Sequence, residues 1–271
     1  MPDVTPGGAI PIGAWELAIA TVFVLVAGGL SLRMGLKLER DLAIATVRTY
    51  LQLFALGFVL RWVFVNQTWP IVLALLGVMV VAAARVVLKR AGNAPPGVFG
   101  SSVVAMALTG FTVTFAVTAL IVRVPVWYEA RYVLPIAGMV IGNSMTGIAL
   151  AVERLFADLD ARSAEMLGLA ALGAGVWECA RPSVRTALTA GLVPTINSMA
   201  AAGVVFIPGM MTGQILAGAD PLEATKYQIV VMLMIAAATS IGAIASVMLM
   251  YRKRFTEDGV YLEKGYREPA A

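Results

Sequence analysis

Long apolar stretches separated by short polar segments make up most of this chain. A helix needs about 20 mostly apolar residues to cross the hydrocarbon core of a membrane. About seven stretches are long enough, and they cover residues 14–32, 42–60, 70–88, 101–122, 132–151, 187–207 and 228–250. The pattern predicts an all-α integral membrane protein, with a polytopic bundle of about seven transmembrane helices that forms one transmembrane domain over residues 1–251.

One long segment between the fifth and sixth predicted spans departs from this pattern. Residues 152–185 carry nine charged side chains, yet apolar residues such as Leu155 and Met166 still recur at helical spacing. This combination is typical of amphipathic helices beside a membrane. We expect a cytoplasmic amphipathic coupling hairpin that offers a docking surface, with Gly173 and Ala174 in its turn. A structured loop that merely joins two spans is the alternative.

The remaining segments predict shorter features. Residues 208–219 are too apolar for a free loop and too short to span, so a re-entrant or interfacial turn fits them. Asp220, Pro221 and Glu223 then place an acid at the N-cap, a proline at N1 and a glutamate at N3, which is typical of a helix start. We expect the charged residues 252–271 to form a disordered cytoplasmic tail.

Composition and charge agree with a membrane protein and orient it. The chain of 271 residues is 60% hydrophobic and 13% charged, whereas soluble domains carry about 25% charged residues. Of the 20 lysines and arginines, fifteen fall in segments predicted on one side of the membrane and four on the other. Because cytoplasmic segments are rich in basic residues, we expect the N-terminus outside and the C-terminus in the cytoplasm. The basic residues therefore indicate topology and not nucleic-acid binding.

The residue types on which most enzymes depend are scarce. The chain has no histidine and a single cysteine, Cys179, which removes the commonest catalytic base and any cysteine cluster within one copy. The sequence contains no phosphate-binding G-x4-G-K-[ST] motif, no dinucleotide fingerprint and no Gly-x-Ser-x-Gly. These absences leave a membrane enzyme without support from the sequence, and we expect a protein that is not itself an enzyme and that carries no cofactor.

Two predicted spans carry polar side chains that need an explanation. In the second span Arg48 and Gln52 are four residues apart and share one helix face. A charge inside a membrane is costly, so Arg48 indicates a pathway or gating residue, unless it joins helices or reaches the cytoplasmic interface. In the fourth span, threonines such as Thr109 and Thr114 either bond back to their own helix or line a substrate path.

The fifth and sixth predicted spans contain polar runs beside prolines and glycines. Asn-Ser-Met occurs in both spans, and Met-Thr-Gly occurs twice in this part of the chain. Interrupted, polar spans are the best sequence indication of a transport site, and helix packing alone is the alternative. Together with Arg48 and Gln52, the residues predicted to line a substrate pathway are Asn143, Ser144, Met145, Thr146, Asn197, Ser198, Met199, Met210 and Met211. Their side chains offer oxygen and thioether ligands, and the sequence leaves the identity of any metal open.

Two long blocks of the chain resemble the FetB-like permeases. The first block contains RYVLPIAGM at 131–139 and GNSMTG at 142–147, and the second contains LVPTINSM at 192–199, PGMMTG at 208–213 and AGADP at 217–221. Members of this family are membrane subunits of ABC exporters implicated in bacterial iron export. Similar plant proteins are linked to aluminium tolerance, with a nucleotide sugar proposed as substrate. The stretch AALGAGVW at 170–177 is similar to the coupling segment of ABC permeases.

The resemblance implies a multi-pass permease of the bacterial inner membrane that exports a metal, with iron as the expected cargo. It implies a separate cytoplasmic ABC ATPase that docks on residues 152–185, and we expect the permease to work as a homodimer. The residues expected to couple the two proteins are Glu165, Leu172, Gly173, Ala174 and Trp177. Export of a nucleotide sugar or other anionic solute, an ion-coupled secondary transporter and a non-transporting membrane scaffold are the alternatives.

Overall fold

Two compact units make up the structure, a computed structural model that describes residues 12–92, 95–256 and 259–262. The first unit combines Met1–Gln67 with Gly209–Ala224, and the second combines Thr68–Pro208 with Thr225–Ala271. The regular secondary structure of the described residues is helical, so the predicted all-α membrane bundle is confirmed.

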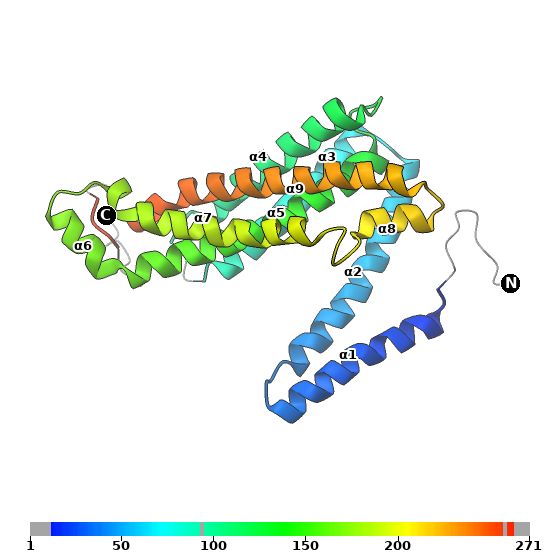
Figure 1. Ribbon diagram of the computed structural model, residues 1–271, viewed down its shortest axis with the longest axis horizontal. Coiled ribbons are helices and arrows are strands. Elements are labelled where there is room, and N and C mark those ends of the chain that lie inside the picture. The colour runs from blue at the N-terminus through cyan, green and yellow to red at the C-terminus, as the bar shows by residue number, and fades with distance from the viewer. Residues whose placement is uncertain (1–11, 93–94, 257–258, 263–271) are drawn as a thin grey trace. The chain divides into compact units, whose positions relative to one another are not determined.

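The first unit contains a helical hairpin formed by α1 (Ala14–Met34) and α2 (Glu39–Val65) (Figure 1). α1 ends where Gly35 adopts a φ of 66°, a left-handed conformation that costs glycine little. The Tyr50 hydroxyl lies 2.8 Å from the Thr21 hydroxyl. This hydrogen bond joins the two helices across an otherwise apolar cleft.

A short helix and a helix start complete the first unit. α8 covers Gly209–Leu216, so the segment predicted to be re-entrant or interfacial contains a helix of 8 residues, too short to span a membrane. The next helix, α9 (Pro221–Met250), begins as predicted. The Asp220 carboxylate accepts hydrogen bonds from the backbone N–H groups of Leu222 and Glu223, at 2.9 and 3.1 Å.

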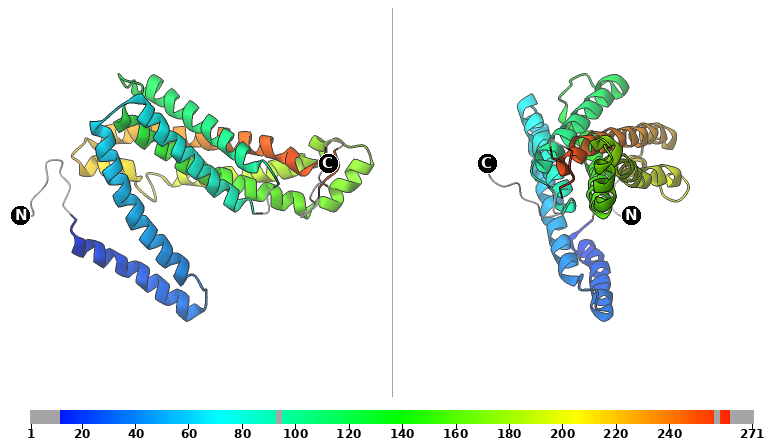
Figure 2. Two further views of the ribbon diagram at one scale, coloured as in Figure 1. Left: turned by 180° about the vertical axis from the view of Figure 1, so that it is seen from behind. Right: turned by 90° about the vertical axis from the view of Figure 1, so that its left-hand side faces the viewer.

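The second unit is a bundle with α5 at its centre. Its elements are α3 (Trp69–Arg90), α4 (Val98–Ala116), the π-helix η1 (Val117–Val122), α5 (Ala130–Ala161), α6 (Ser163–Ala171), α7 (Val176–Ala201), α9 from Thr225 onward and the 3-10 helix η2 (Tyr251–Arg254). α5 packs against α3, α4 and α7 (Figure 1 and Figure 2). Its many buried apolar side chains therefore form the core of this unit.

The tightest packing in the second unit joins α5, α7 and α9 at glycines. A Cβ atom added to Gly191 of α7 would lie 2.7 Å from the carbonyl oxygen of Gly147 and 2.8 Å from the Cβ of Ala151, both on α5. A Cβ atom added to Gly147 would overlap the Thr239 side chain of α9. Because backbone atoms cannot move aside as a flexible side chain can, glycines here allow the three helices to approach this closely.

Among the residues that the structure describes, 6 helices are long and apolar enough to cross a membrane. They are α1, α2, α3, α4 with η1, α5 and α9 with η2, which correspond to the other predicted spans. The predicted span 187–207 corresponds to α7, whose 26 residues are interrupted by Pro182 and Pro194 and carry more polar side chains. α7 has a length of about 39 Å at 1.5 Å per residue, which exceeds the thickness of the hydrocarbon core.

The packing of α7 predicts that it is a return crossing. α5 and α9 finish at the same end of the second unit, because Asp160 near the end of α5 bonds to Arg254 and Tyr261 just beyond α9. The chain between these helices must therefore run back along the bundle. α7 does so, since it packs along α5 in the opposite direction (Figure 1). We therefore expect a membrane that contains α5 and α9 to contain α7 as well.

The boundaries of the predicted coupling hairpin differ from the prediction. α5 is one continuous helix to Ala161, and α7 begins at Val176 and ends at Ala201. The segment 152–185 therefore consists largely of the ends of two long helices, with α6 as a separate short helix between them. Periodicity could not reveal these ends, because the helical spacing of apolar residues continues through the polar region.

The prediction of a disordered tail is wrong for the residues that the structure describes. Tyr251–Arg254 form a 3-10 helix, and Phe255 pairs with Tyr261 in an isolated antiparallel β-bridge. Arg254 is 6% exposed and Tyr261 is 5% exposed. Residues 257–258 and 263–271 of the predicted tail lie outside the described part of the chain. The described tail residues are therefore packed into the second unit.

Cysteine labelling tests whether α7 crosses the membrane. Leu172 before α7 and Val204 after it are each 87% exposed, so single cysteines at these positions should be accessible. We expect Leu172→Cys and Val204→Cys, each combined with Cys179→Ala, to react with an impermeant thiol reagent from opposite sides. Reaction of both positions from one side would show that α7 does not cross.

Substitution of Gly191 tests the close approach of the helices. Gly191→Ala should destabilise the protein by about 1–3 kcal/mol, because the added methyl group meets the backbone of α5. The measurement is the melting temperature of the purified protein. Gly142→Ala is the matched control, since a Cβ atom there meets nothing within 4 Å. Equal melting temperatures for the two variants would contradict the proposed packing.

Candidate functional site

A small cavity lies between α5, α7 and α9, beside the glycine contact. Its volume is about 180 Å³, and it is lined by Asn143, Thr146, Gly147, Pro194, Thr195, Ser198, Met232 and Ile235. The first three belong to α5, the next three to α7 and the last two to α9. The lining combines an amide, three hydroxyl groups and a thioether with apolar surface, and none of these side chains is charged.

Two residues contribute to the polar character of the cavity: a proline, and an asparagine whose side chain bonds to the backbone of its own helix. Pro194 has no N–H group, so the carbonyl of Ala190 lacks its usual helical donor. Asn143 donates a hydrogen bond from Nδ2 to the carbonyl of Met139 at 2.8 Å. The side-chain oxygen of Asn143 remains an acceptor. The cavity therefore presents hydrogen-bonding groups that the helices do not use internally.

The cavity contains only part of the predicted substrate pathway. Asn143, Thr146 and Ser198 line it. The other predicted residues of these two helices lie outside the lining: Ser144, which is fully buried, Asn197, which is exposed, and the half-buried Met145 and Met199. Each Asn-Ser-Met run thus contributes one side chain to the cavity, Asn143 from α5 and Ser198 from α7.

The remaining predicted pathway residues belong to the first unit. Arg48 and Gln52 are exposed on α2, and Met210 and Met211 are half-buried on α8. Among the described residues, Arg48 has no hydrogen-bond or ion-pair partner. An exposed guanidinium on an apolar helix attracts anionic groups, which include lipid phosphates and anionic solutes.

The ligand chemistry of a conventional metal site is missing from the described part of the chain. No group of three or more His, Cys, Asp or Glu side chains is placed there to hold a metal ion. The cavity offers neutral oxygen atoms and a thioether. Such a lining would bind a bare cation weakly, because no ligand compensates its charge.

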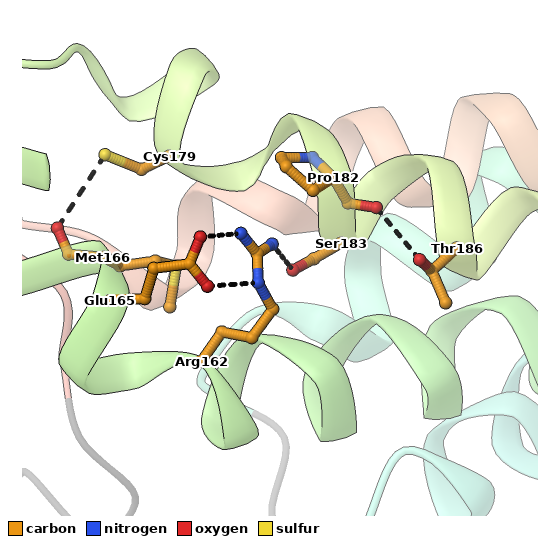
Figure 3. A network of polar contacts seen from close by, with 7 residues as sticks. All are labelled: Arg162, Glu165, Met166, Cys179, Pro182, Ser183 and Thr186. Carbon is orange, nitrogen blue, oxygen red and sulfur yellow. Dashed lines mark hydrogen bonds and ion pairs between the residues drawn. The ribbon is translucent and has the colours of Figure 1, made fainter.

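A second candidate region is the elbow, which we define as residues 162–175 between α5 and α7. Arg162 donates hydrogen bonds to both carboxylate oxygens of Glu165, at 2.8 and 2.6 Å (Figure 3). It also donates one to the Ser183 hydroxyl of α7 at 3.0 Å. Arg162 therefore connects the end of α5, the start of α6 and the first half of α7.

The pair of Arg162 and Glu165 has a defined pH dependence. Its hydrogen bonds lower the pKa of Glu165 below the ordinary value of a glutamate and raise the pKa of Arg162. The pair therefore stabilises the elbow above the ordinary pKa of glutamate, and this contribution is lost as the pH falls through the lowered pKa. The Glu165 side chain is 55% exposed, so water screens the interaction and its contribution is small.

The turn of the elbow exposes apolar groups beside a hollow. Gly173 has a φ of 86°, and the neighbouring Leu172 is 87% exposed. A hollow of about 440 Å³ is lined by Leu167, Ala170, Ala171, Ala174, Gly175, Val176, Gly259 and Val260. Leu167 and Val260 are themselves exposed. A cluster of exposed apolar side chains around a hollow marks an interaction surface.

The described residues after α9 pack against the elbow end of the bundle. The Asp160 carboxylate accepts hydrogen bonds from the Tyr261 hydroxyl and from Arg254, the latter at 3.4 Å. The Arg254 guanidinium also lies over the Phe156 ring, 5.7 Å from its centroid. These contacts join the end of α9 to the end of α5.

The predicted coupling residues all lie at the elbow or at the start of α7. Glu165 pairs with Arg162, Leu172 and Gly173 form the turn, and Ala174 lines the hollow. The Trp177 ring packs edge-on against Tyr251 of η2, with ring centroids 5.6 Å apart.

Sequence reasoning missed the contributions of α9 and of the tail. Met232 and Ile235 line the cavity from within a nearly uniform apolar run, so no polar residue marked them. Gly259 and Val260 line the hollow from a segment whose charge indicated disorder. Only the spacing of four and three residues along α9 could have indicated which of its faces is buried.

Comparison with known proteins places this geometry in a family. A family model described as an uncharacterised protein family, UPF0014, matches residues 14–255. This match includes both the cavity and most of the elbow end of the bundle. No solved structure matches the chain significantly.

Three relatives show the range of the family. The UPF0014 membrane protein YjkA of Bacillus subtilis is 34% identical over 241 residues, which cover 89% of this chain and 95% of the relative. Protein ALUMINUM SENSITIVE 3 of Arabidopsis thaliana is 36% identical over 249 residues, or 90% and 88% of the two chains. The probable iron export permease protein FetB of Escherichia coli is 33% identical over 238 residues, or 88% and 90%. The resemblance to FetB-like permeases is thereby confirmed, and the chain belongs to the UPF0014 family of membrane proteins.

Proposed function

We propose that this chain is the membrane-spanning permease subunit of an ABC-type exporter whose cargo is a metal, with iron as the first candidate. The cavity between α5, α7 and α9 carries the proposal. Its polar residues Asn143, Thr146 and Ser198 are exposed on membrane helices, where contact with lipid would cost free energy that packing does not require. The Escherichia coli relative is named as a probable iron export permease, which supports iron. Hydrolysis of ATP is assigned to a partner chain, so this chain is not itself an enzyme.

The elbow is the proposed docking surface for a cytoplasmic ABC ATPase. Its hollow and the exposed Leu172 are suited to an apolar contact with another protein. The elbow joins the ends of α5 and α7, and the contacts of Asp160 join α9 to the same end. A displacement of the elbow would therefore move the three helices that line the cavity.

The elbow end is proposed to face the cytoplasm, with the permease in the plasma membrane of a bacterium. Basic residues gather at this end, and they include Lys89, Arg90, Arg154, Arg181 and Lys253. The positive-inside rule then favours a cytoplasmic elbow. With α7 as a seventh crossing, the N-terminus is expected outside. The proposed functional form is a homodimer bound to its ATPase.

The chemistry of the cavity constrains the cargo. A neutral lining favours iron held by ligands of its own over a bare cation. An ion-coupled secondary transporter would need an acidic side chain on the path, and the cavity lining has none. An anionic solute such as a nucleotide sugar is the second candidate. It is favoured by Arg48, which is exposed on α2 without a partner among the described residues.

Leucine substitutions test the cavity. Asn143→Leu and Ser198→Leu each fill the cavity and remove a polar group, so efflux of radiolabelled iron from cells should fall about tenfold or more, as expected for the loss of one or two hydrogen bonds. Asn197→Leu is the matched control, because Asn197 adjoins Ser198 in the sequence but lies outside the lining. Immunoblots confirm equal amounts in the membrane. Wild-type efflux in both cavity variants would exclude the cavity as the cargo site.

A charge placed on the elbow tests docking. Leu172→Glu should weaken binding of the ATPase about thirtyfold or more, the effect of losing one central apolar contact. Binding is measured by co-purification and by stimulation of ATP hydrolysis. Val204→Glu is the matched control, because Val204 is equally exposed, at 87%, in the loop at the opposite end of α7. Equal binding by the two variants would contradict docking at the elbow.

A further inference from the structure

One face of α9 carries a line of buried polar side chains that continues from the cavity. This face, spaced by four and three residues, consists of Gln228, Met232, Ile235, Thr239, Gly242 and Ser246. Met232 and Ile235 line the cavity. Gln228 is 7% exposed, and Thr239 and Ser246 are fully buried. The cavity is therefore one widening along a longer polar face, which we call the α9 seam.

The buried side-chain oxygens of the α9 seam have no hydrogen-bond partners among the described residues. This holds for the side-chain oxygens of Gln228, Thr239 and Ser246. It also holds for the hydroxyl groups of Thr109 on α4 and Ser144 on α5. Five buried oxygens on three neighbouring helices are thus left without a donor or acceptor in this conformation.

Other hydroxyl groups of the same helices do find partners. Ser240, beside Thr239 on α9, donates to the carbonyl of Ala236 at 2.8 Å. Ser102 on α4 donates to the carbonyl of Val98 at 2.9 Å. Bonding back to the helix is therefore open to serine and threonine here, and the seam residues do not use it.

At Gly242 the helices of the α9 seam approach so closely that no side chain fits between them. A Cβ atom added to Gly242 would lie 3.0 Å from the Thr109 hydroxyl oxygen and 2.6 Å from Cδ1 of Ile148. The Thr239 side chain likewise touches Gly147 of α5. The seam is therefore closed at Gly147 and Gly242, yet polar. Alanine or valine would fill such an interface without the cost of unsatisfied oxygens.

We infer that the α9 seam is a cargo path closed in this conformation, which opens when α9 separates from α4 and α5. In the open state, water and cargo satisfy the oxygens of Gln228, Thr239, Ser246, Thr109 and Ser144. The path is uncharged and presents amide and hydroxyl groups, so it suits a cargo that displays hydrogen-bonding oxygens, such as a metal within organic ligands. This inference rests on the proposed transport function and extends its site beyond the cavity.

Cysteine accessibility tests the opening of the seam. In a Cys179→Ala background, single cysteines replace Thr239 or Ser246 on the seam. Met234 and Val247, which are also buried on α9 but lie off the seam, provide matched controls. Cells are treated with a small water-soluble methanethiosulfonate reagent, with and without depletion of ATP.

We expect the two seam cysteines to react about tenfold faster or more in one energy state than in the other, and both controls to stay slow, because only an open state hydrates the seam. Equal, slow reaction of all four cysteines would overturn the seam as a path, even if Asn143→Leu still blocks iron efflux. Fast seam labelling that does not respond to ATP supports the path and instead contradicts the proposed ATP-driven mechanism.

Isosteric removal of a hydroxyl group separates transport from packing. Thr239→Val removes an unsatisfied oxygen, so the melting temperature should stay equal or rise while efflux of radiolabelled iron falls about tenfold. Ser240→Ala, which removes a hydroxyl group already bonded to its own helix, should keep wild-type efflux. A lower melting temperature with unchanged efflux for Thr239→Val would show that the seam serves packing, and it would overturn the inference.

Discussion

The contact of α5, α7 and α9 at Gly147 and Gly191 is the constraint on which the second unit depends. Helices in a membrane gain nothing from the hydrophobic effect when they associate, so close packing and hydrogen bonds must hold them together. The absence of side chains at these glycines brings backbone against backbone, and Thr239 completes the contact from α9. The cavity lies directly beside this contact, because Gly147 is shared by both. The geometry of any cargo site here is therefore fixed by packing.

Much of the helical architecture could be predicted from the sequence, because a membrane span is recognisable as a long and mostly apolar stretch. Six of the predicted spans correspond to helices that are long and apolar enough to cross. α7 is the exception. Its prolines and polar residues make it less apolar than a typical membrane span, although it packs along α5 within the bundle. The ordered residues after α9 escaped prediction for another reason. The hydrogen bond between Asp160 and Tyr261 joins positions far apart in the sequence, and such a contact cannot be predicted from local composition.

The candidate site could be predicted in outline only. Polar runs beside prolines pointed to α5 and α7, two of the helices that line the cavity, but not to the faces that meet. A helix turns by about 100° per residue, so Ser198 enters the cavity while its neighbour Asn197 does not. The same rotation buries Ser144 beside Asn143. The contribution of α9 was hidden, because apolar residues such as Met232 and Ile235 reveal no chemistry until a partner helix is known.

The two candidate regions lie at different heights of the same three helices, and this explains how one could act on the other. At the elbow, hydrogen bonds of Arg162 and Asp160 tie the ends of α5, α7 and α9 together. At the cavity, the same helices touch through glycines and unsatisfied hydroxyl groups, and the described residues form no side-chain hydrogen bonds across this interface. A force applied at the elbow therefore meets an end joined by hydrogen bonds and a middle joined by packing alone. Packing contacts lack the directional bonds of the elbow, so the α9 seam is where we propose that the helices separate.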